Sequence, residues 1–129
     1  MGSALGTGAA GMASVGAWKK CYAQNRAAPF LLVAFIGAPL SQTIYGMILM
    51  GSILTAAQTA ERFPALIVAG VLGGIAMAFS AWMQGRAGAG AADALAETGK
   101  GFGNYLMALG IIETVALFVM VFLMMNLGG

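Results

Sequence analysis

One acidic residue stands in the middle of the most apolar stretch of this chain. In GIIETVALFVMVFLMMNL, residues 110–127, Glu113 is the single ionisable side chain. A charge at the centre of a membrane helix costs about 2.5–3.5 kcal/mol on insertion scales. The carboxyl group must therefore be protonated, paired or bound to a cation, and a group that exchanges between such states is a candidate ion carrier.

Four further polar side chains are expected at the depth of Glu113: Ser41, Gln42, Tyr45 and Gln84. Ser41 and Tyr45 are four residues apart and share one face of a helix, with Gln42 beside them. Gln84 reaches the same depth when the third and fourth apolar stretches pair as an antiparallel hairpin. A carboxylate, two amides, a hydroxyl and a phenol can then meet in the middle of the membrane.

All of these groups offer hard oxygen atoms, which suit an alkali cation or a proton and not a soft metal. Pro39 has no N–H for the carbonyl of helical residue 35, so backbone oxygen is available nearby, and we include the backbone of Ala38. The expected Na⁺ ligands are then the side chains of Ser41, Gln42, Gln84 and Glu113. Tyr45 is expected to donate to the carboxylate. Both Na⁺ and H⁺ stay open, and the oxygen-rich surroundings favour Na⁺. The alternative is that these polar groups only bridge helices, at about 0.6 kcal/mol each.

The composition is that of a protein whose solvent is lipid. Of its 129 residues, 60% are hydrophobic and 8% are charged, whereas about a quarter of the residues in soluble domains are charged. The net charge of +2 comes from basic residues too scattered for a nucleic-acid-binding patch. The chain has no histidine, the commonest general base, and its lone Cys21 cannot form an internal disulfide.

Four apolar stretches, separated by short polar ones, predict an all-α membrane protein with four transmembrane helices. They cover residues 2–18, about 30–57, about 65–92 and about 102–127. The last three reach the length of about 20 residues that a span needs. The first falls short, so its helix is expected to be truncated at the N-terminus. Residues 1–129 are expected to form a single membrane domain.

The two halves of the chain are alike. LSQTIYGMILM at 40–50 aligns with IIETVALFVMV at 111–121, and a stretch rich in Gly and Ala precedes each. This pattern predicts a duplicated helical hairpin, at 1–58 and 63–128. Small residues let membrane helices approach closely, so the Gly/Ala-rich helices are expected in a tight inner layer and the bulkier helices toward lipid. Copies packed into a ring would complete that inner layer.

Basic residues indicate the orientation of the chain. They flank the first and third loops, at Lys19, Lys20, Arg26, Arg86 and Lys100, whereas the second loop has Arg62 beside Glu61. By the positive-inside rule, the first and third loops are expected on the cytoplasmic side.

Two nucleotide-binding patterns are excluded by their context. GTGAAG at 6–11 fits G-x-G-x-x-G, but that motif requires a strand before it and a βαβ unit around it. ETGKG at 97–101 has Ala94 where a phosphate loop needs its first glycine, and Gly101 where it needs a hydroxyl. We therefore expect no nucleotide hydrolysis by this chain itself.

Three segments resemble the K or c proteolipid of V-type and A-type ion-translocating ATPases. They are GAPLSQTIYG at 37–46, QGRAGAGAADALAETGKG at 84–101 and IIETVALFVM at 111–120. The resemblance covers essentially the whole chain from Gly2 onward. It implies a four-helix subunit of a homo-oligomeric rotor ring, in which Glu113 carries Na⁺ or H⁺ past a stator subunit whose arginine displaces the ion. It also implies a central-stalk subunit docked at the cytoplasmic loops. The expected location is the plasma membrane of a prokaryote, with no cofactor and no nucleic acid.

In sodium-transporting members of that family, the ligand positions match Ser41, Gln42, Gln84 and Glu113, with Tyr45 bonded to the carboxylate. Ser41 departs from the usual threonine, although it keeps the hydroxyl group. A rival function is that of a small proton-coupled multidrug exporter, which also has four helices and one membrane glutamate. In those exporters the acid lies in the first helix among aromatic residues, whereas Glu113 lies in the fourth among amides and hydroxyls.

Overall fold

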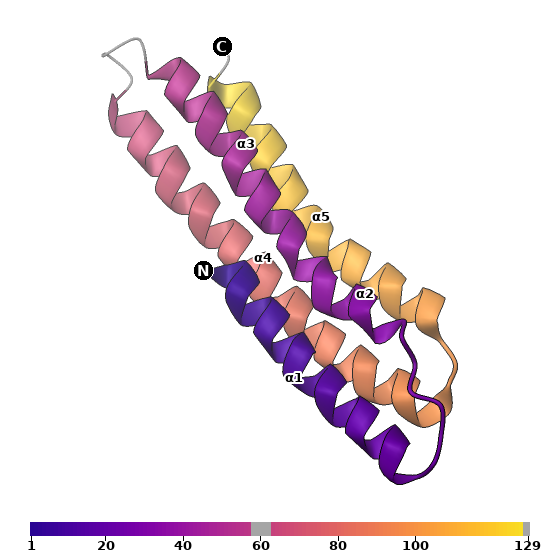
Figure 1. The fold of residues 1–129 in the computed structure, drawn as a ribbon. Helices are drawn as coiled ribbons and strands as arrows, with labels where there is room; N and C mark the ends of the chain where they lie inside the picture. Colours follow the sequence, from indigo (N-terminus) through magenta and orange to yellow (C-terminus); the bar gives the residue numbers. More distant parts are fainter. Residues whose placement is uncertain (58–62, 128–129) are drawn as a thin grey trace.

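The computed structural model describes residues 1–57 and 63–127, and nearly all of them are helical. The elements are α1 (Gly2–Ala23), α2 (Leu32–Gly37), the short 3₁₀ helix η1 (Ala38–Leu40), α3 (Ser41–Ala56), α4 (Phe63–Thr98) and α5 (Phe102–Leu127). They form one elongated bundle (Figure 1). The prediction of an all-α protein is confirmed.

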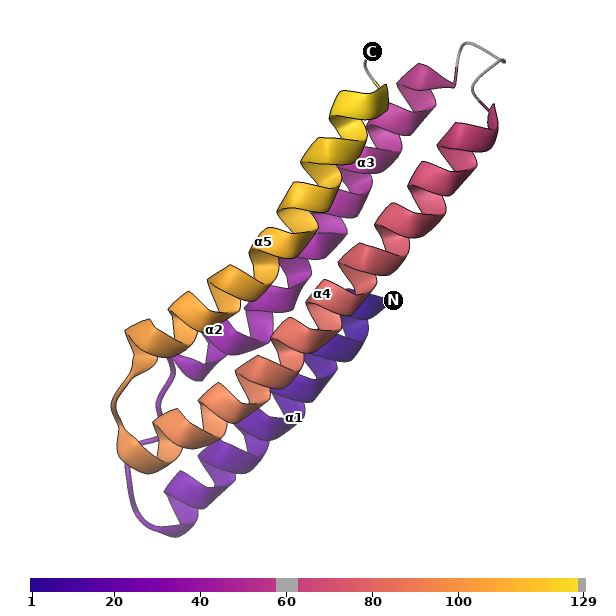
Figure 2. The same ribbon diagram turned by 180° about the vertical axis from the view of Figure 1, so that it is seen from behind.

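Two helical hairpins run in the same direction through the bundle. α1 lies along the second half of α4 and parallel to it, with Gly2 against Ala78 at one end and Cys21 against Ala96 at the other. α2 and α3 continue each other and lie beside α5 (Figure 2). The α1–α2 and α4–α5 connections share one end of the bundle, which we call the loop end. This arrangement is the one expected for a duplicated hairpin.

Three helical stretches of the described residues are long and apolar enough to cross a membrane. They are Leu32–Ala56, Phe63–Thr98 and Phe102–Leu127. The remaining long helix, α1, has 22 residues, and its first residue lies level with the middle of α4 (Figure 1). The chain is thus a multi-pass helical membrane protein. The expected hairpin ends at residues 58 and 128, and Glu61 and Arg62 of the second loop, lie outside the described residues.

Two predicted helix ends are wrong. α1 continues beyond residue 18 to Ala23, and α4 continues beyond residue 92 to Thr98. Polar residues at these two ends contact each other: Lys20 and Glu97 form an ion pair between the two helices. α4 then stops at Gly99, whose φ of 66° is a conformation that glycine adopts without strain.

The second span is interrupted immediately before its polar residues. η1 contains the buried Pro39, which has no N–H to offer to the carbonyl of Phe35. A Cβ added at Gly88 would lie 3.0 Å from that carbonyl oxygen, so the carbonyl faces α4. The expected break in helical hydrogen bonding therefore lies just before Ser41 and Gln42.

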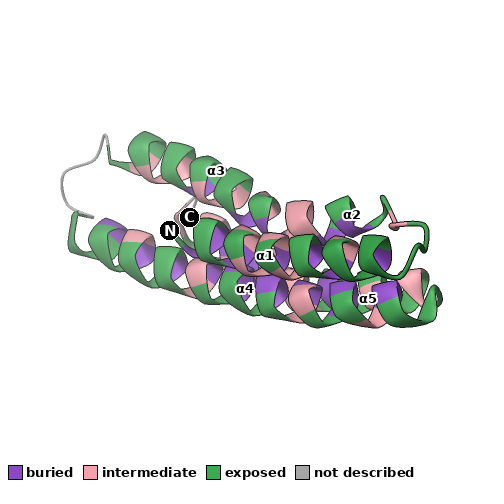
Figure 3. Ribbon diagram, turned by 60° about the horizontal axis from the view of Figure 1, so that its bottom comes forward, coloured by how far each residue is buried: buried purple, intermediate pink, exposed green. Residues whose placement is uncertain are grey.

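α1 and α4 meet almost backbone to backbone. A Cβ built on Gly85 would lie 2.1 Å from Cα of Gly6, and one built on Gly6 would lie 2.2 Å from the carbonyl oxygen of Ala81. Figure 3 shows the buried faces of the helices turned toward each other and the exposed faces turned outward. The close packing of the two small-residue helices is confirmed, and their inner position in a ring remains a prediction.

Buried apolar side chains gather in two clusters at different heights. The cluster nearer the loop end includes Leu32, Phe35, Leu95 and Leu109. The cluster farther from it consists of Leu49, Met77, Ala116 and Met120. Along α4, along α5 and from α2 to α3, the polar residues come between the two clusters, so the polar site is enclosed by apolar packing above and below.

The α1–α4 interface gives a first prediction. Gly85→Ala is expected to destabilise the detergent-solubilised protein by about 1–3 kcal/mol, because the added methyl group meets backbone atoms that cannot yield. Thermal unfolding followed by circular dichroism measures the change. Gly90→Ala on the same helix is the matched control, since a Cβ there has no atom within 4 Å. Equal stability of the two variants would contradict the packing.

Candidate ion site

A layer of polar side chains crosses the bundle between the two apolar clusters. We call it the polar layer, and its members are Ser41, Gln42, Tyr45, Ser80, Gln84 and Glu113. Gln84 is completely buried, and Gln42 and Ser80 are 3% and 6% exposed. Glu113 and Tyr45 are half-buried. The layer is therefore closed on the side of the bundle interior and partly open at the carboxyl group.

Both oxygens of the Glu113 carboxyl group accept hydrogen bonds. The hydroxyl of Tyr45 on α3 donates to Oε1 at 2.5 Å, and Nε2 of Gln84 on α4 donates to Oε2 at 3.3 Å. Within the described residues the one ion pair joins Lys20 and Glu97 at the loop end. The carboxyl group is thus held by neutral donors, and a proton or a cation must supply any neutralising charge.

Gln84 connects the three helices of the layer. Its Nε2 donates to the carbonyl of Leu109 at 3.0 Å as well as to Glu113, which lies one helical turn further along α5. Its Oε1 accepts from Nε2 of Gln42 at 2.9 Å. A fully buried amide must have its donors and acceptor engaged, and these contacts meet that requirement.

Three candidate ligand oxygens lie together at the start of α3. The hydroxyl of Ser41 lies 2.9 Å from the carbonyl oxygen of Ala38 and 3.2 Å from Oε1 of Gln42. Because a serine hydroxyl has one hydrogen, it donates to one of these oxygens at a time. In the described ranges no three His, Cys, Asp or Glu side chains are placed to hold a metal ion. The layer instead offers carboxylate, amide, hydroxyl and carbonyl oxygens, which hard cations prefer.

The structure brings together all five side chains that the sequence pointed to, and the backbone of Ala38 adjoins them. Their roles as ion ligands remain predictions. Sequence reasoning missed Ser80, which donates to the carbonyl of Ile112 at 3.0 Å and accepts from Gln42 at 3.4 Å. The spacing of four residues between Ser80 and Gln84 places both on one face of α4 and could have revealed it.

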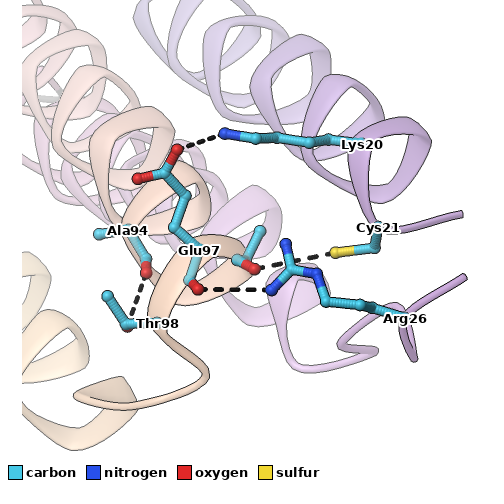
Figure 4. Close-up of polar contacts among 7 residues, drawn as sticks. Lys20, Cys21, Arg26, Ala94, Glu97 and Thr98 are labelled. Carbon is cyan, nitrogen blue, oxygen red and sulfur yellow. Dashed lines mark hydrogen bonds and ion pairs between the residues drawn. The ribbon is translucent and has the colours of Figure 1, made fainter. Parts of the chain in front are cut away.

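Charged side chains join the two hairpins at the loop end (Figure 4). Lys20 pairs with the carboxylate of Glu97, and Nη1 of Arg26 donates to the backbone carbonyl of Glu97 at 3.4 Å. The hydrogen bond and the opposite charge of Glu97 raise the pKa of Lys20. Arg86 has a separate contact on α4, with its guanidinium 5.7 Å from the ring centre of Trp82. The contacts of Lys20 and Arg26 with Glu97 thus join the ends of α1 and α4 beside the expected cytoplasmic loops.

The structure is thus that of a helical membrane protein with one hydrogen-bonded carboxyl group among its apolar helices. The family model of the ATP synthase C subunit matches residues 67–125, which include Gln84 and Glu113. The match covers most of the second hairpin, a little under half of the chain, and that hairpin is similar to this family of membrane proteolipids. No curated protein and no solved structure matches the chain.

The family match supports a rotor-ring proteolipid subunit of an ion-translocating ATPase. Subunits of this family form homo-oligomeric rings beside a stator subunit and are not catalytic by themselves. The match favours this function over that of a small multidrug exporter.

The geometry of the carboxyl group gives a second prediction. Tyr45→Phe removes the donor to Oε1, so a carbodiimide is expected to label Glu113 about fivefold faster, the effect of losing one hydrogen bond of about 1 kcal/mol. Mass spectrometry of the labelled protein measures the rate. Tyr22→Phe, at an exposed position near the end of α1, is the control and should leave the rate unchanged. An unchanged rate in Tyr45→Phe would contradict the role of this bond.

Proposed function

We propose that this chain is the rotor-ring proteolipid of a V-type ATPase and that it carries Na⁺ or H⁺ across the membrane on Glu113. The observation that carries the proposal is the Glu113 carboxyl group, bonded to Gln84 and Tyr45 within apolar packing. The family match over the same hairpin supports it. ATP hydrolysis belongs to other subunits of the complex.

The proposed cycle alternates between a loaded and an unloaded carboxyl group. A bound Na⁺ or H⁺ neutralises Glu113, so the site can face lipid while the ring turns, without the cost of an isolated charge. At the stator subunit, an arginine offers the carboxylate a competing partner, and the ion leaves. Tyr45 and Gln84 keep donating to the carboxyl oxygens, which holds the group in place for the next ion.

Within this proposal, the arrangement of oxygens favours Na⁺ as the ion. The hydroxyl of Ser41, the amide of Gln42 and the carbonyl of Ala38 adjoin one another, and a proton alone would require none of them. Together with Gln84 and Glu113 they offer oxygens of the type that Na⁺ takes.

The aligned halves of the chain support the V-type assignment. Where the second hairpin has Glu113, the first has Gln42, so one acid serves four helices. For a ring of given helix number, this halves the ions moved per turn. Fewer ions per ATP allow a larger ion gradient to be built, which favours pumping over ATP synthesis.

We further propose that the loop end faces the cytoplasm of a prokaryote and contacts the central-stalk subunit. The support is the set of basic residues there: Lys19, Lys20, Arg26 and Lys100. The same proposal makes the chain one membrane domain, embedded in the lipid of the plasma membrane.

A third prediction tests the carrier itself. Glu113→Gln is expected to abolish ATP-driven ion transport by the reconstituted complex, because a neutral amide cannot exchange an ion. Ring assembly, followed by native electrophoresis, should persist, since the amide keeps the size of the side chain. Glu97→Gln, which changes an exposed acid at the loop end, is the matched control. Transport by the Glu113→Gln complex at the wild-type rate would refute the proposed function.

A fourth prediction concerns the choice of ion. Millimolar Na⁺ is expected to slow carbodiimide labelling of Glu113, and Gln84→Ala should raise the half-protecting Na⁺ concentration at least about tenfold by removing a ligand and a donor. Labelling is measured over a range of pH with and without Na⁺. Indifference of the wild-type protein to Na⁺ at every pH would leave H⁺ as the ion carried.

A further inference from the structure

We infer that Ser80 is a positioning residue of the ion site, which sets the orientation of the Gln42 amide and the height of Glu113. This inference rests on the proposed function, since it concerns the same site. Ser80 lies on α4, and its hydroxyl is the one group of the polar layer that bonds to both α3 and α5 without itself being a candidate ligand.

The first part of the inference concerns the amide of Gln42. Its nitrogen has two hydrogens, and two acceptors face it from α4: Oε1 of Gln84 at 2.9 Å and Oγ of Ser80 at 3.4 Å. With both hydrogens engaged on α4, the amide oxygen is turned toward the hydroxyl of Ser41, 3.2 Å away. That orientation presents the oxygen on the side of the other candidate ligands. Without Ser80, one hydrogen of a buried amide loses its acceptor, and the amide is free to turn.

The second part concerns the position of Glu113 on α5. The hydroxyl hydrogen of Ser80 goes to the carbonyl of Ile112, the residue that precedes Glu113, at 3.0 Å. One turn away on α4, Gln84 bonds to the carbonyl of Leu109. These two bonds tie α5 to α4 at successive levels, and Glu113 follows directly after them. A shift of α5 along α4 would break both bonds as it moved the carboxyl group.

Ser80 is well placed for this role because its hydroxyl both donates and accepts a hydrogen bond within the protein. The side chain is 6% exposed, its hydrogen is given to Ile112 and a lone pair accepts from Gln42. The two partners of this hydroxyl lie on different helices. Its removal therefore breaks one bond to α3 and one to α5, and affects the position of these two helices relative to each other. A serine that only filled space would be replaceable by any side chain of its size.

Three variants separate the hydroxyl from the volume of the side chain. Ser80→Ala removes the hydroxyl, Ser80→Cys keeps the size with a much weaker hydrogen-bonding group, and Ser80→Thr keeps the hydroxyl. Ser52→Ala is the matched control, because the Ser52 hydroxyl bonds to its own helix, at the carbonyl of Ile48, outside the polar layer.

Two readouts are taken on the assembled ring. The first is the Na⁺ concentration that half-protects Glu113 from a carbodiimide at fixed pH. We expect an increase of about fivefold to tenfold in Ser80→Ala and Ser80→Cys, as for one lost hydrogen bond, and less than about twofold in Ser80→Thr and Ser52→Ala. The second is the side-chain nitrogen resonance of Gln42 in solid-state NMR. It should shift in Ser80→Ala and Ser80→Cys and keep its place in the two other variants.

A merely structural serine would give a different pattern. Ser80→Cys would then match the wild-type protein, or ring stability would fall in proportion to the loss of protection, and either result would overturn the inference. Failure of the Na⁺ assignment in the proposed function is recognised separately, from the wild-type ring. If Na⁺ does not protect wild-type Glu113, the Na⁺ assignment fails. Ser80 is then judged by the Gln42 resonance and by ATP-driven proton transport, which Ser80→Ala and Ser80→Cys should lower and Ser80→Thr should preserve.

Discussion

The structure depends on one constraint: a carboxyl group placed inside an apolar bundle must have partners. Glu113 obtains them from two other helices, through Tyr45 and Gln84. The buried amide of Gln84 in turn needs partners of its own, and Gln42 and the carbonyl of Leu109 provide them. Each satisfied group thus requires the next, because an unpaired polar group in this setting costs several kcal/mol. The relative height of α3, α4 and α5 follows from this chain of bonds, and the two apolar clusters pack around it.

The sequence predicted which polar side chains meet, because membrane depth and helical spacing are both read directly from residue numbers. Counting along antiparallel spans placed Gln84 beside Glu113, and a spacing of four placed Ser41 and Tyr45 on one face. The helix ends were predicted less well. Lys20 and Glu97 looked like loop residues because they are charged, yet both are helical and pair with each other between α1 and α4. Ser80 was missed, although its spacing of four residues from Gln84 places both side chains on one face of α4, where Gln42 and Ile112 face it.

The two helical hairpins place two positions that align in the predicted repeat, Gln42 and Glu113, within one polar layer. Gln42 corresponds to Glu113 in the repeat, and it is bonded to Gln84, which is bonded to Glu113. An acid at both positions would put two carboxylates into one apolar layer, where like charges strongly disfavour joint ionisation. An amide at the first position instead supplies two donors and an acceptor without a charge. An amide in the first hairpin thus suits a well-bonded acid in the second.

In the proposed cycle the carboxyl group must be held firmly and still release its ion, and the uneven burial of the layer suits both needs. The amides and Ser80 are almost completely buried, whereas Glu113 and Tyr45 are half-buried. The proposed ligands on the buried side would therefore be fixed before an ion arrives, which would lower the entropy lost on binding. The carboxyl group at the open edge can meet a partner from outside the chain. Because Tyr45 and Gln84 are neutral donors, an arginine that brings an opposite charge can compete for the carboxylate while Gln84, Gln42 and Ser80 keep their places.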